Sequence, residues 1–175
     1  MYSYILDLLP YKSSFRFVEE ISHVDADGVV GHYTLRPDAF FYTDHFPGNP
    51  VTPGAILTEI MAQIGLVVLG IYLITGGKAP AGASFSDDPA AAGSPGAPTG
   101  GGVASIFPLL SSANVEFYKM ALPGQRLTVT SKKEYFRFDK LKCQVEMHDA
   151  TGVRVAKGVF SGFIKSAGGP KVHRL

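Results

Sequence analysis

His45 and Glu59 are the side chains in this 175-residue chain whose types and spacing point most directly to catalysis. A neutral imidazole can accept a proton and a carboxylic acid can donate one, so the two could act as general base and general acid. The histidine lies in segment 44–53, here called the strap. Proline fixes its own φ and pushes the preceding residue toward extended geometry, so a proline-rich strap can hold the imidazole in place. Besides the histidine, the strap contains Phe46, Pro47, Pro50 and Pro53.

Glu59 belongs to an apolar run, residues 54–74, which predicts one long helix buried on all sides. Thr58, Glu59 and Gln63 are almost the only polar groups of this run. An acid enclosed by apolar side chains is favoured in its protonated form, which keeps a proton available for transfer. Gln63 follows one helical turn later on the same face, so we expect it to orient the carboxyl group by a hydrogen bond.

The same run is long enough to cross a bilayer. However, a charged Glu59 would be costly near the bilayer centre, and no cluster of Lys or Arg flanks either end of the run. A helix that is apolar all round is also expected in the core of a globular domain. We therefore expect a core helix and no association with a membrane.

Alternating polar and apolar residues predict strands on both sides of this helix. Two strands precede it and four follow, and an antiparallel sheet wrapped around the single helix would cover all its apolar sides. The sequence therefore predicts an α+β fold, with residues 1–165 forming one domain. The expected strands are 15–21, 28–36, 114–118, 125–138, 141–147 and 153–164, and the expected turns are 25–28, 139–140 and 149–152.

Two segments do not follow this pattern. Residues 76–105 are dominated by Gly, Ala, Pro and Ser with the single aromatic Phe85, so they cannot bury enough surface to offset the entropy of ordering. We expect a mobile insertion there, with a lid over the active-site mouth as the alternative. The tail, residues 166–175, is expected to be flexible.

Composition excludes several classes of function. A net charge of +1 and a pI near 7.9 give no field that favours nucleic acid. The single cysteine, Cys143, excludes an intramolecular disulfide and a cysteine-based zinc site, and it is expected to be a small core residue. His23 and His32 lack the spacing of metal ligands, so no metal is predicted. The lack of a signal-peptide pattern and the single thiol favour the cytoplasm.

The strap and helix together resemble the 3-hydroxyacyl-acyl carrier protein dehydratases, the FabZ-like hot-dog family. That motif reads His-Phe-Pro-x-x-Pro-x-x-Pro-Gly, then an acid, then Ala-Gln. Tyr11 departs from the histidine that is usual in the family, and Met120 and Gln125 depart from its proline and aspartate. A glutamate at position 59 is similar to the branch that dehydrates without isomerising. The residues that match the motif are His45, Phe46, Pro47, Pro50, Pro53, Gly54, Glu59, Ala62 and Gln63.

The resemblance implies a hot-dog fold and the dehydration of (3R)-hydroxyacyl groups carried by phosphopantetheine on acyl carrier protein, in fatty acid, polyene or pigment biosynthesis. His45 would remove the C2 proton and Glu59 would protonate the departing hydroxyl. Gly54 opens the helix, where unpaired amides point outward, so its N–H is the expected oxyanion donor. The family implies no cofactor. It also implies a homodimer or an oligomer of dimers, each site combining the histidine of one subunit with the glutamate of the other.

Two other functions stay open. A hot-dog thioesterase would hydrolyse the acyl thioester, and a non-catalytic subunit would only bind the acyl chain. Several basic residues are either solvated strand faces or a docking patch for the acidic carrier protein. These residues are Lys132, Lys133, Arg137, Lys140 and Lys142, with Lys119 and Arg126 as further candidates.

Overall fold

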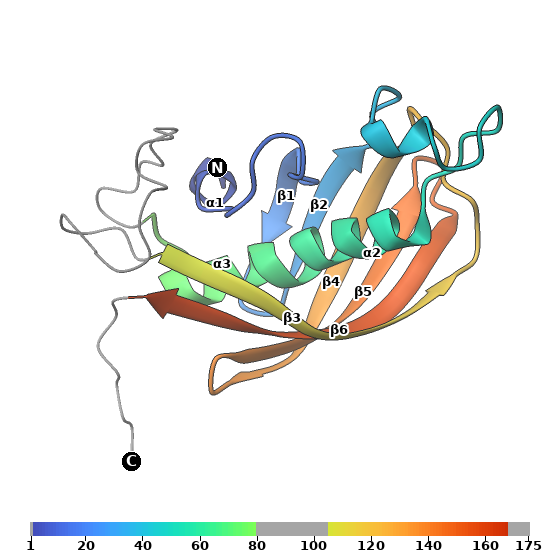
Figure 1. The fold of residues 1–175 in the computed structure, drawn as a ribbon. Helices are drawn as coiled ribbons and strands as arrows, with labels where there is room; N and C mark the ends of the chain where they lie inside the picture. Colours follow the sequence, from blue (N-terminus) through green and yellow to red (C-terminus); the bar gives the residue numbers. More distant parts are fainter. Residues whose placement is uncertain (1, 80–104, 168–175) are drawn as a thin grey trace, which may run out of the picture.

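The computed structural model describes residues 2–79 and 105–167. Within them, six strands form one antiparallel sheet in the order β1-β2-β4-β5-β6-β3, and a long helix lies along one face of that curved sheet (Figure 1). The strands are β1 (Glu20–Val24), β2 (Gly28–Thr34), β3 (Ser105–Phe117), β4 (Arg126–Arg137), β5 (Lys140–Asp149) and β6 (Arg154–Ala167). The helical elements are α1 (Ser3–Asp7), η1 (Phe40–Tyr42), α2 (Gly54–Ala62), η2 (Gln63–Val68) and α3 (Leu69–Thr75). The predicted α+β hot-dog fold is confirmed.

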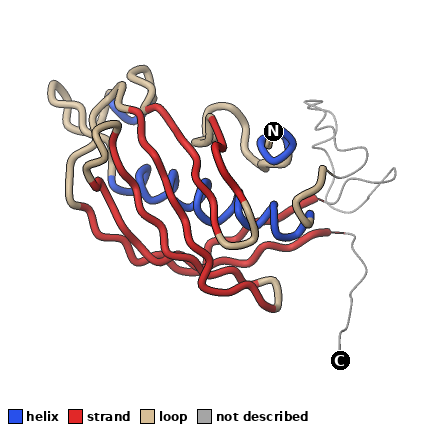
Figure 2. The backbone as a smooth tube through the Cα atoms, turned by 180° about the vertical axis from the view of Figure 1, so that it is seen from behind, coloured by secondary structure: helices blue, strands red, loops and turns tan. Residues whose placement is uncertain are grey.

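The predicted helix is one continuous rod, in which α2 and α3 are joined by the wide π-helical turns of η2. Its 22 residues are apolar enough to cross a membrane, but 72% of the most apolar window is buried inside the fold. The view from behind shows the sheet covering this helix (Figure 2). Glycine permits the close approach, because a Cβ on Gly65 would lie 2.7 Å from the Val145 side chain, and one on Gly70 would lie 2.6 Å from Ile164. The helix therefore rests almost directly on the sheet.

The first predicted strand, residues 15–21, is partly wrong. Strand β1 begins only at Glu20, because backbone groups of Phe15 and Phe17 bond to a side chain instead of a strand. The Phe17 N–H donates to Gln63 Oε1, and the Phe15 carbonyl accepts from Gln63 Nε2, both at 2.8 Å. Bonding to β2 begins only at Glu19, whose N–H donates to the His32 carbonyl at 3.0 Å.

The second half of the chain departs from the prediction in its boundaries. Strand β3 begins at Ser105, nine residues before the predicted start at 114, because this edge strand exposes apolar side chains and lacks a clear alternation. The turn between β4 and β5 is at Phe138 and Asp139, which both have positive φ, and not at 139–140. The insertion predicted at 76–105 falls mostly on residues 80–104, outside the described residues, as do residues 168–175 of the tail. Strand β6 continues to Ala167, past the predicted start of that tail.

Cys143 is fully buried, as predicted, and its thiol donates to the Gly65 carbonyl at 3.4 Å. Burial raises the pKa of this thiol to about 11, so it stays protonated and unreactive at neutral pH. The cysteine is thus a packing residue of the core and not a nucleophile.

Candidate active site

The strap follows η1 and projects from the end of the sheet at which α2 begins (Figure 1). His45 is partly buried in it, while the residues on either side are exposed. The Nδ1 atom of His45 lies 2.9 Å from the Val51 carbonyl oxygen. Since a carbonyl can only accept, Nδ1 carries the hydrogen of the neutral ring. The lone pair is then on Nε2, which is the atom able to take a proton from a substrate.

The backbone around His45 is turned tightly. Its N–H donates to the Phe41 carbonyl at 3.0 Å, and Phe46 adopts φ 58°, a conformation that is uncommon for a residue other than glycine. This turn brings the Phe46 ring to 4.2 Å from the imidazole, centroid to centroid. Backbone strain of this kind gathers at functional sites, and here it belongs to the residue beside the proposed base.

Glu59 and Gln63 are brought together as predicted. Gln63 Nε2 donates to Glu59 Oε1 at 2.8 Å from one helical turn away. The same amide group also bonds to Phe15 and Phe17, so the fully buried Gln63 uses its oxygen and both of its hydrogens. The carboxyl group is therefore oriented by a side chain that cannot rotate without losing three hydrogen bonds. Among the described hydrogen bonds, Glu59 Oε2 has no partner.

Gly54 begins α2, directly after Pro53, as predicted. The Pro53 carbonyl accepts from the amides of Ile56 and Leu57, and none of the hydrogen bonds in the described residues uses the Gly54 N–H as donor. A Cβ at this position would lie 3.2 Å from the Phe117 ring. Glycine therefore lets the helix start lie against strand β3, with an amide free to meet a ligand.

His45 and Glu59 are not in contact within one chain: no hydrogen bond or ion pair among the described residues joins them. Each is held by its own partner, Val51 for the imidazole and Gln63 for the carboxyl. The shared site implied by the family resemblance stays a prediction.

Sequence reasoning missed two buried hydroxyls, one within the strap at Thr52 and one just before it at Tyr42. The Tyr42 and Thr52 hydroxyls lie 2.6 Å apart, and the Thr52 N–H donates to the Ala121 carbonyl at 2.8 Å. Thr52 is only 4% exposed, although residues 46–50 are all exposed. The available signal was a threonine among the strap prolines, too weak to identify its partner ten residues earlier. An open hollow of about 440 Å³ borders this part of the strap, and Tyr42 and Pro50 are among the residues that line it.

Tyr11, which departs from the family motif, is a third residue whose surroundings sequence did not reveal. Burial raises the pKa of its phenol to about 12, and the nearby Glu59 carboxylate adds to the shift. Tyr11 therefore keeps its hydrogen at any physiological pH.

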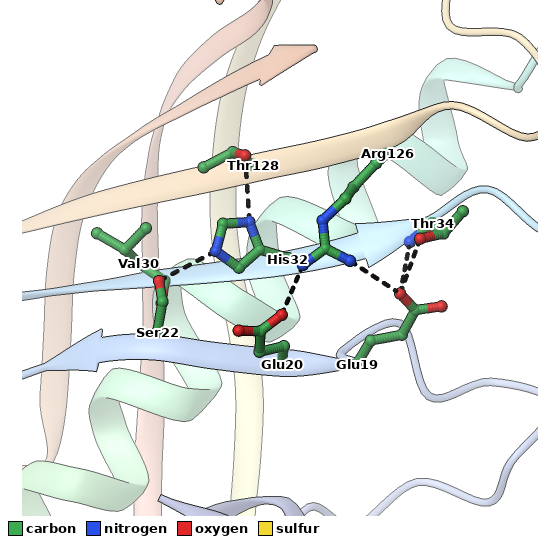
Figure 3. A network of polar contacts seen from close by, with 8 residues as sticks. All are labelled: Glu19, Glu20, Ser22, Val30, His32, Thr34, Arg126 and Thr128. Carbon is green, nitrogen blue, oxygen red and sulfur yellow. Dashed lines mark hydrogen bonds and ion pairs between the residues drawn. The ribbon is translucent and has the colours of Figure 1, made fainter. Parts of the chain in front are cut away.

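His23 and His32, which lack the spacing of metal ligands, are held by ordinary polar contacts. His23 bonds to Asp25 at 2.9 Å. His32 bonds through its two ring nitrogens to Thr128 and Ser22, in a network that also joins Arg126 to Glu20 (Figure 3). No group of three or more His, Cys, Asp or Glu residues within 2–79 and 105–167 is arranged to hold a metal ion.

Most of the basic residues considered for carrier-protein docking already have acidic partners. The pairs are Lys119 with Asp149, Arg126 with Glu20, Lys133 with Asp27, and Lys142 with Glu134. Arg137 and Lys140 lie instead over the rings of Tyr135 and Phe163. These rings and cations line a hollow of about 450 Å³ at the β4–β5 hairpin, away from the strap (Figure 1).

Comparisons with known proteins show similarity in sequence over part of the chain. Residues 9–94 match the family model of the FabA-like domain. The 3-hydroxyacyl-[acyl-carrier-protein] dehydratase FabZ of Geobacter metallireducens is 37% identical over 62 residues, which are 35% of this chain and 41% of that protein. The bifunctional enzyme LpxC/FabZ of Porphyromonas gingivalis is 42% identical over 66 residues, 37% of this chain and 14% of that protein. The match thus spans less than half the length of these relatives.

Solved structures extend the likeness of fold to most of the chain. The dehydratase heterocomplex ApeI:P of Xenorhabdus doucetiae superposes with a TM-score of 0.64, at 13% identity, covering 92% of this chain and 90% of that one. A hypothetical thioesterase with coenzyme A from Streptococcus pneumoniae gives a TM-score of 0.53 at 12% identity, covering 84% and 85%. At such identities the likeness shows the fold alone. The chain therefore has a hot-dog fold, and it is similar in sequence to the FabA-like domain over residues 9–94 and to FabZ dehydratases over about a third of its length.

Proposed function

We propose that this protein is a hydro-lyase that dehydrates (3R)-hydroxyacyl thioesters on acyl carrier protein to trans-2-enoyl thioesters. The observation that carries the proposal is that the chain contains both a base of fixed tautomer and an oriented acid, each held by its own hydrogen-bond partner. Val51 orients the imidazole of His45, and Gln63 orients the carboxyl of Glu59. Residues 1–165 would act as one catalytic domain.

The reaction needs one proton removed from C2 and one hydroxyl lost from C3. His45 Nε2 takes the C2 proton, and the electron pair of that bond forms the C2=C3 double bond. Glu59 gives a proton to the departing hydroxyl, which leaves as water. Oε2 is the carboxyl oxygen suited to this transfer, since Gln63 occupies Oε1. The enzyme returns to its starting state when the proton on His45 is passed back to Glu59 through solvent.

Negative charge develops on the thioester oxygen as the C2 proton leaves. The Gly54 N–H, at the positive end of α2, is the donor we assign to this oxygen. One such donor is typically worth about 10²- to 10³-fold in rate.

We propose that two copies of the chain complete the site, because His45 and Glu59 have no contact within one. The exposed edge of β3 supports this arrangement: it pairs with β6 on one side and exposes Phe107, Leu109 and Leu110. Such an edge invites pairing with a second copy. Phe117 of the same strand lies against Gly54, so that contact would lie next to the start of the catalytic helix.

Acyl carrier protein is the proposed partner, and fatty acid or related acyl-chain synthesis in the cytoplasm is the proposed setting. The FabZ relatives, which match about a third of this chain, support both. Thioester hydrolysis is the second candidate, since a hypothetical thioesterase shares the fold.

One assay separates the candidates. The purified protein is incubated with a 3-hydroxyacyl thioester and with a saturated acyl thioester, and enoyl absorbance and free thiol are followed together. We expect enoyl product from the first substrate and thiol from neither. Release of thiol from both without enoyl product would establish a thioesterase. The variants His45→Ala and Glu59→Ala should each abolish enoyl formation, whereas Phe138→Ala, changed at a distant exposed hairpin, should retain it.

A further inference from the structure

We propose that Tyr42 and Thr52 are positioning residues for His45, acting through the peptide group that joins Val51 to Thr52. This inference rests on the proposed function of His45. Neither residue touches the reacting atoms. Their hydroxyls fix the hydrogen-bond acceptor that determines which imidazole nitrogen carries the hydrogen.

The first step is that one peptide group makes two hydrogen bonds, one to His45 and one to the loop that follows β3. Its carbonyl, from Val51, accepts from His45 Nδ1 at 2.9 Å, and its N–H, from Thr52, donates to the Ala121 carbonyl at 2.8 Å. The peptide group is planar, so a rotation that breaks one of these bonds also disturbs the other. Hydrogen bonds in such a chain also polarise one another, which strengthens the carbonyl as an acceptor.

The second step is that the hydroxyl pair fixes this peptide group through Thr52, whose side chain bonds to Tyr42. Tyr42 and Thr52 are both buried, and their oxygens are 2.6 Å apart. Burial raises the pKa of the Tyr42 phenol, so the pair stays neutral and keeps both hydrogens. The strap beyond it is exposed from Phe46 to Pro50. Thr52 is therefore a buried residue that anchors an otherwise exposed loop to the rest of the fold.

The third step is that Ala121 is itself held firmly. It is fully buried, in the loop that follows β3. Lys119, two residues earlier, donates to Asp149 at 2.5 Å, and Asp149 also accepts from the amides of Thr151 and Val153. The acceptor for the Thr52 N–H thus belongs to the loop between β3 and β4, and Lys119 ties this loop to the end of β5.

The consequence concerns the tautomer of the base. If the Val51 carbonyl turned away, the hydrogen on Nδ1 would lose its acceptor, and the neutral ring could carry its hydrogen on either nitrogen. Fewer molecules would then have the lone pair on Nε2. A misplacement of about 1 Å at a catalytic group can cost about 10²-fold in rate. Loss of the hydroxyl pair should therefore lower kcat more than it raises KM.

The test compares Thr52→Val, Tyr42→Phe, the double variant and Thr52→Ser. We expect the first two to lower kcat by about 10- to 100-fold with KM changed by less than about threefold. Thr52→Ser keeps a hydroxyl and should restore most of the rate. The double variant should be no slower than the worse single variant, because both changes break the same bond. Thr75→Val is the matched control, since its hydroxyl donates to the Ile71 and Tyr72 carbonyls of α3, away from the strap, and it should leave kcat unchanged.

A second measurement does not depend on turnover. The ¹⁵N chemical shifts of the His45 ring should report one tautomer, with hydrogen on Nδ1, in the wild type, and a mixture in Thr52→Val and Tyr42→Phe. A wild type without dehydratase activity would refute the proposed function, while this spectrum would still test the positioning. Should Thr52→Val fail to fold, Tyr42→Phe carries the test. Unchanged spectra together with kcat within twofold of the wild type in both variants would overturn the inference.

Discussion

Gln63 Nε2 donates to Glu59 Oε1 at 2.8 Å while the rest of the same amide bonds to the backbone of Phe15 and Phe17. One side chain thus connects the proposed acid to the segment leading into β1. That segment lies more than 40 residues earlier in the chain, so the orientation of the carboxyl depends on the fold around it and not on the helix alone.

Replacement of Gln63 by alanine should therefore harm both stability and catalysis. It leaves the buried Phe17 N–H without its partner, which costs about 1–3 kcal/mol, whereas the Phe15 carbonyl belongs to an exposed residue and loses less. We expect a lower melting temperature in calorimetry and a kcat reduced by about tenfold or more. Gln144→Ala is the control, because this exposed amide bonds only to Glu134. Equal effects of the two substitutions would contradict the special role of Gln63.

A mixture of two inactive variants tests whether the site is shared between subunits. His45→Ala and Glu59→Ala chains are co-expressed and purified together. If each site combines the histidine of one chain with the glutamate of its partner, half of the dimers are mixed and each has one intact site, so about a quarter of wild-type activity should return. Sites formed within one chain would stay inactive in every combination. Each variant expressed alone provides the background rate.

Asp149 should make the stability of the fold sensitive to acid, because it holds the loop between β3 and β4 through Lys119. Lys119, followed by Thr151 and the backbone amides of the turn, holds the pKa of its carboxyl well below the ordinary value of about 4. Because the pKa is lower in the folded state, the charged carboxylate stabilises the fold above about pH 4, and this contribution is lost as pH falls further. Asp149→Asn keeps an acceptor for the turn but loses the ion pair. The difference in melting temperature between this variant and the wild type should be largest at neutral pH and should shrink below about pH 4.

The contradicting result would be a difference in melting temperature that stays constant from pH 7 to pH 3. Asp38→Asn is a suitable control, because Asp38 is exposed and pairs with the exposed Arg36. Exposed pairs of this kind contribute little to stability. Its melting curve should follow that of the wild type at every pH.

Local periodicity predicted the features that depend on neighbours in sequence. Glu59 and Gln63 are four residues apart on a helix, so their contact followed from the helical repeat. The hydroxyl pair of Tyr42 and Thr52 has no such repeat, because both residues lie in or beside an irregular loop. The fold brings these two hydroxyls together, and no pattern along the chain predicts their contact.

Edge strand β3 shows why its start was predicted nine residues too late. Alternation predicts a strand when one face is buried, but most side chains of β3 are exposed in the single chain. Phe107, Leu109 and Leu110 are nearly consecutive apolar residues on an open edge, a pattern that fits no half-buried strand. A surface of this kind suits an interface, which a single sequence does not display.

The edge of β3 should therefore determine the oligomeric state. Leu109→Glu adds a charge to the exposed apolar edge, and a buried charge without a partner is costly at an interface. We expect the wild type to sediment as a dimer or a multiple of dimers, and Leu109→Glu to shift toward the monomer and to lose dehydratase activity together with the partner's contribution to the site. Phe138→Glu is the matched control: Phe138 is 94% exposed, more than Leu109, but it lies at the β4–β5 hairpin instead of the β3 edge. This variant should stay assembled and active, because the added charge remains in water. If Leu109→Glu sedimented like the wild type and kept its activity, the two copies would meet elsewhere, and the completion of the site across β3 would be wrong.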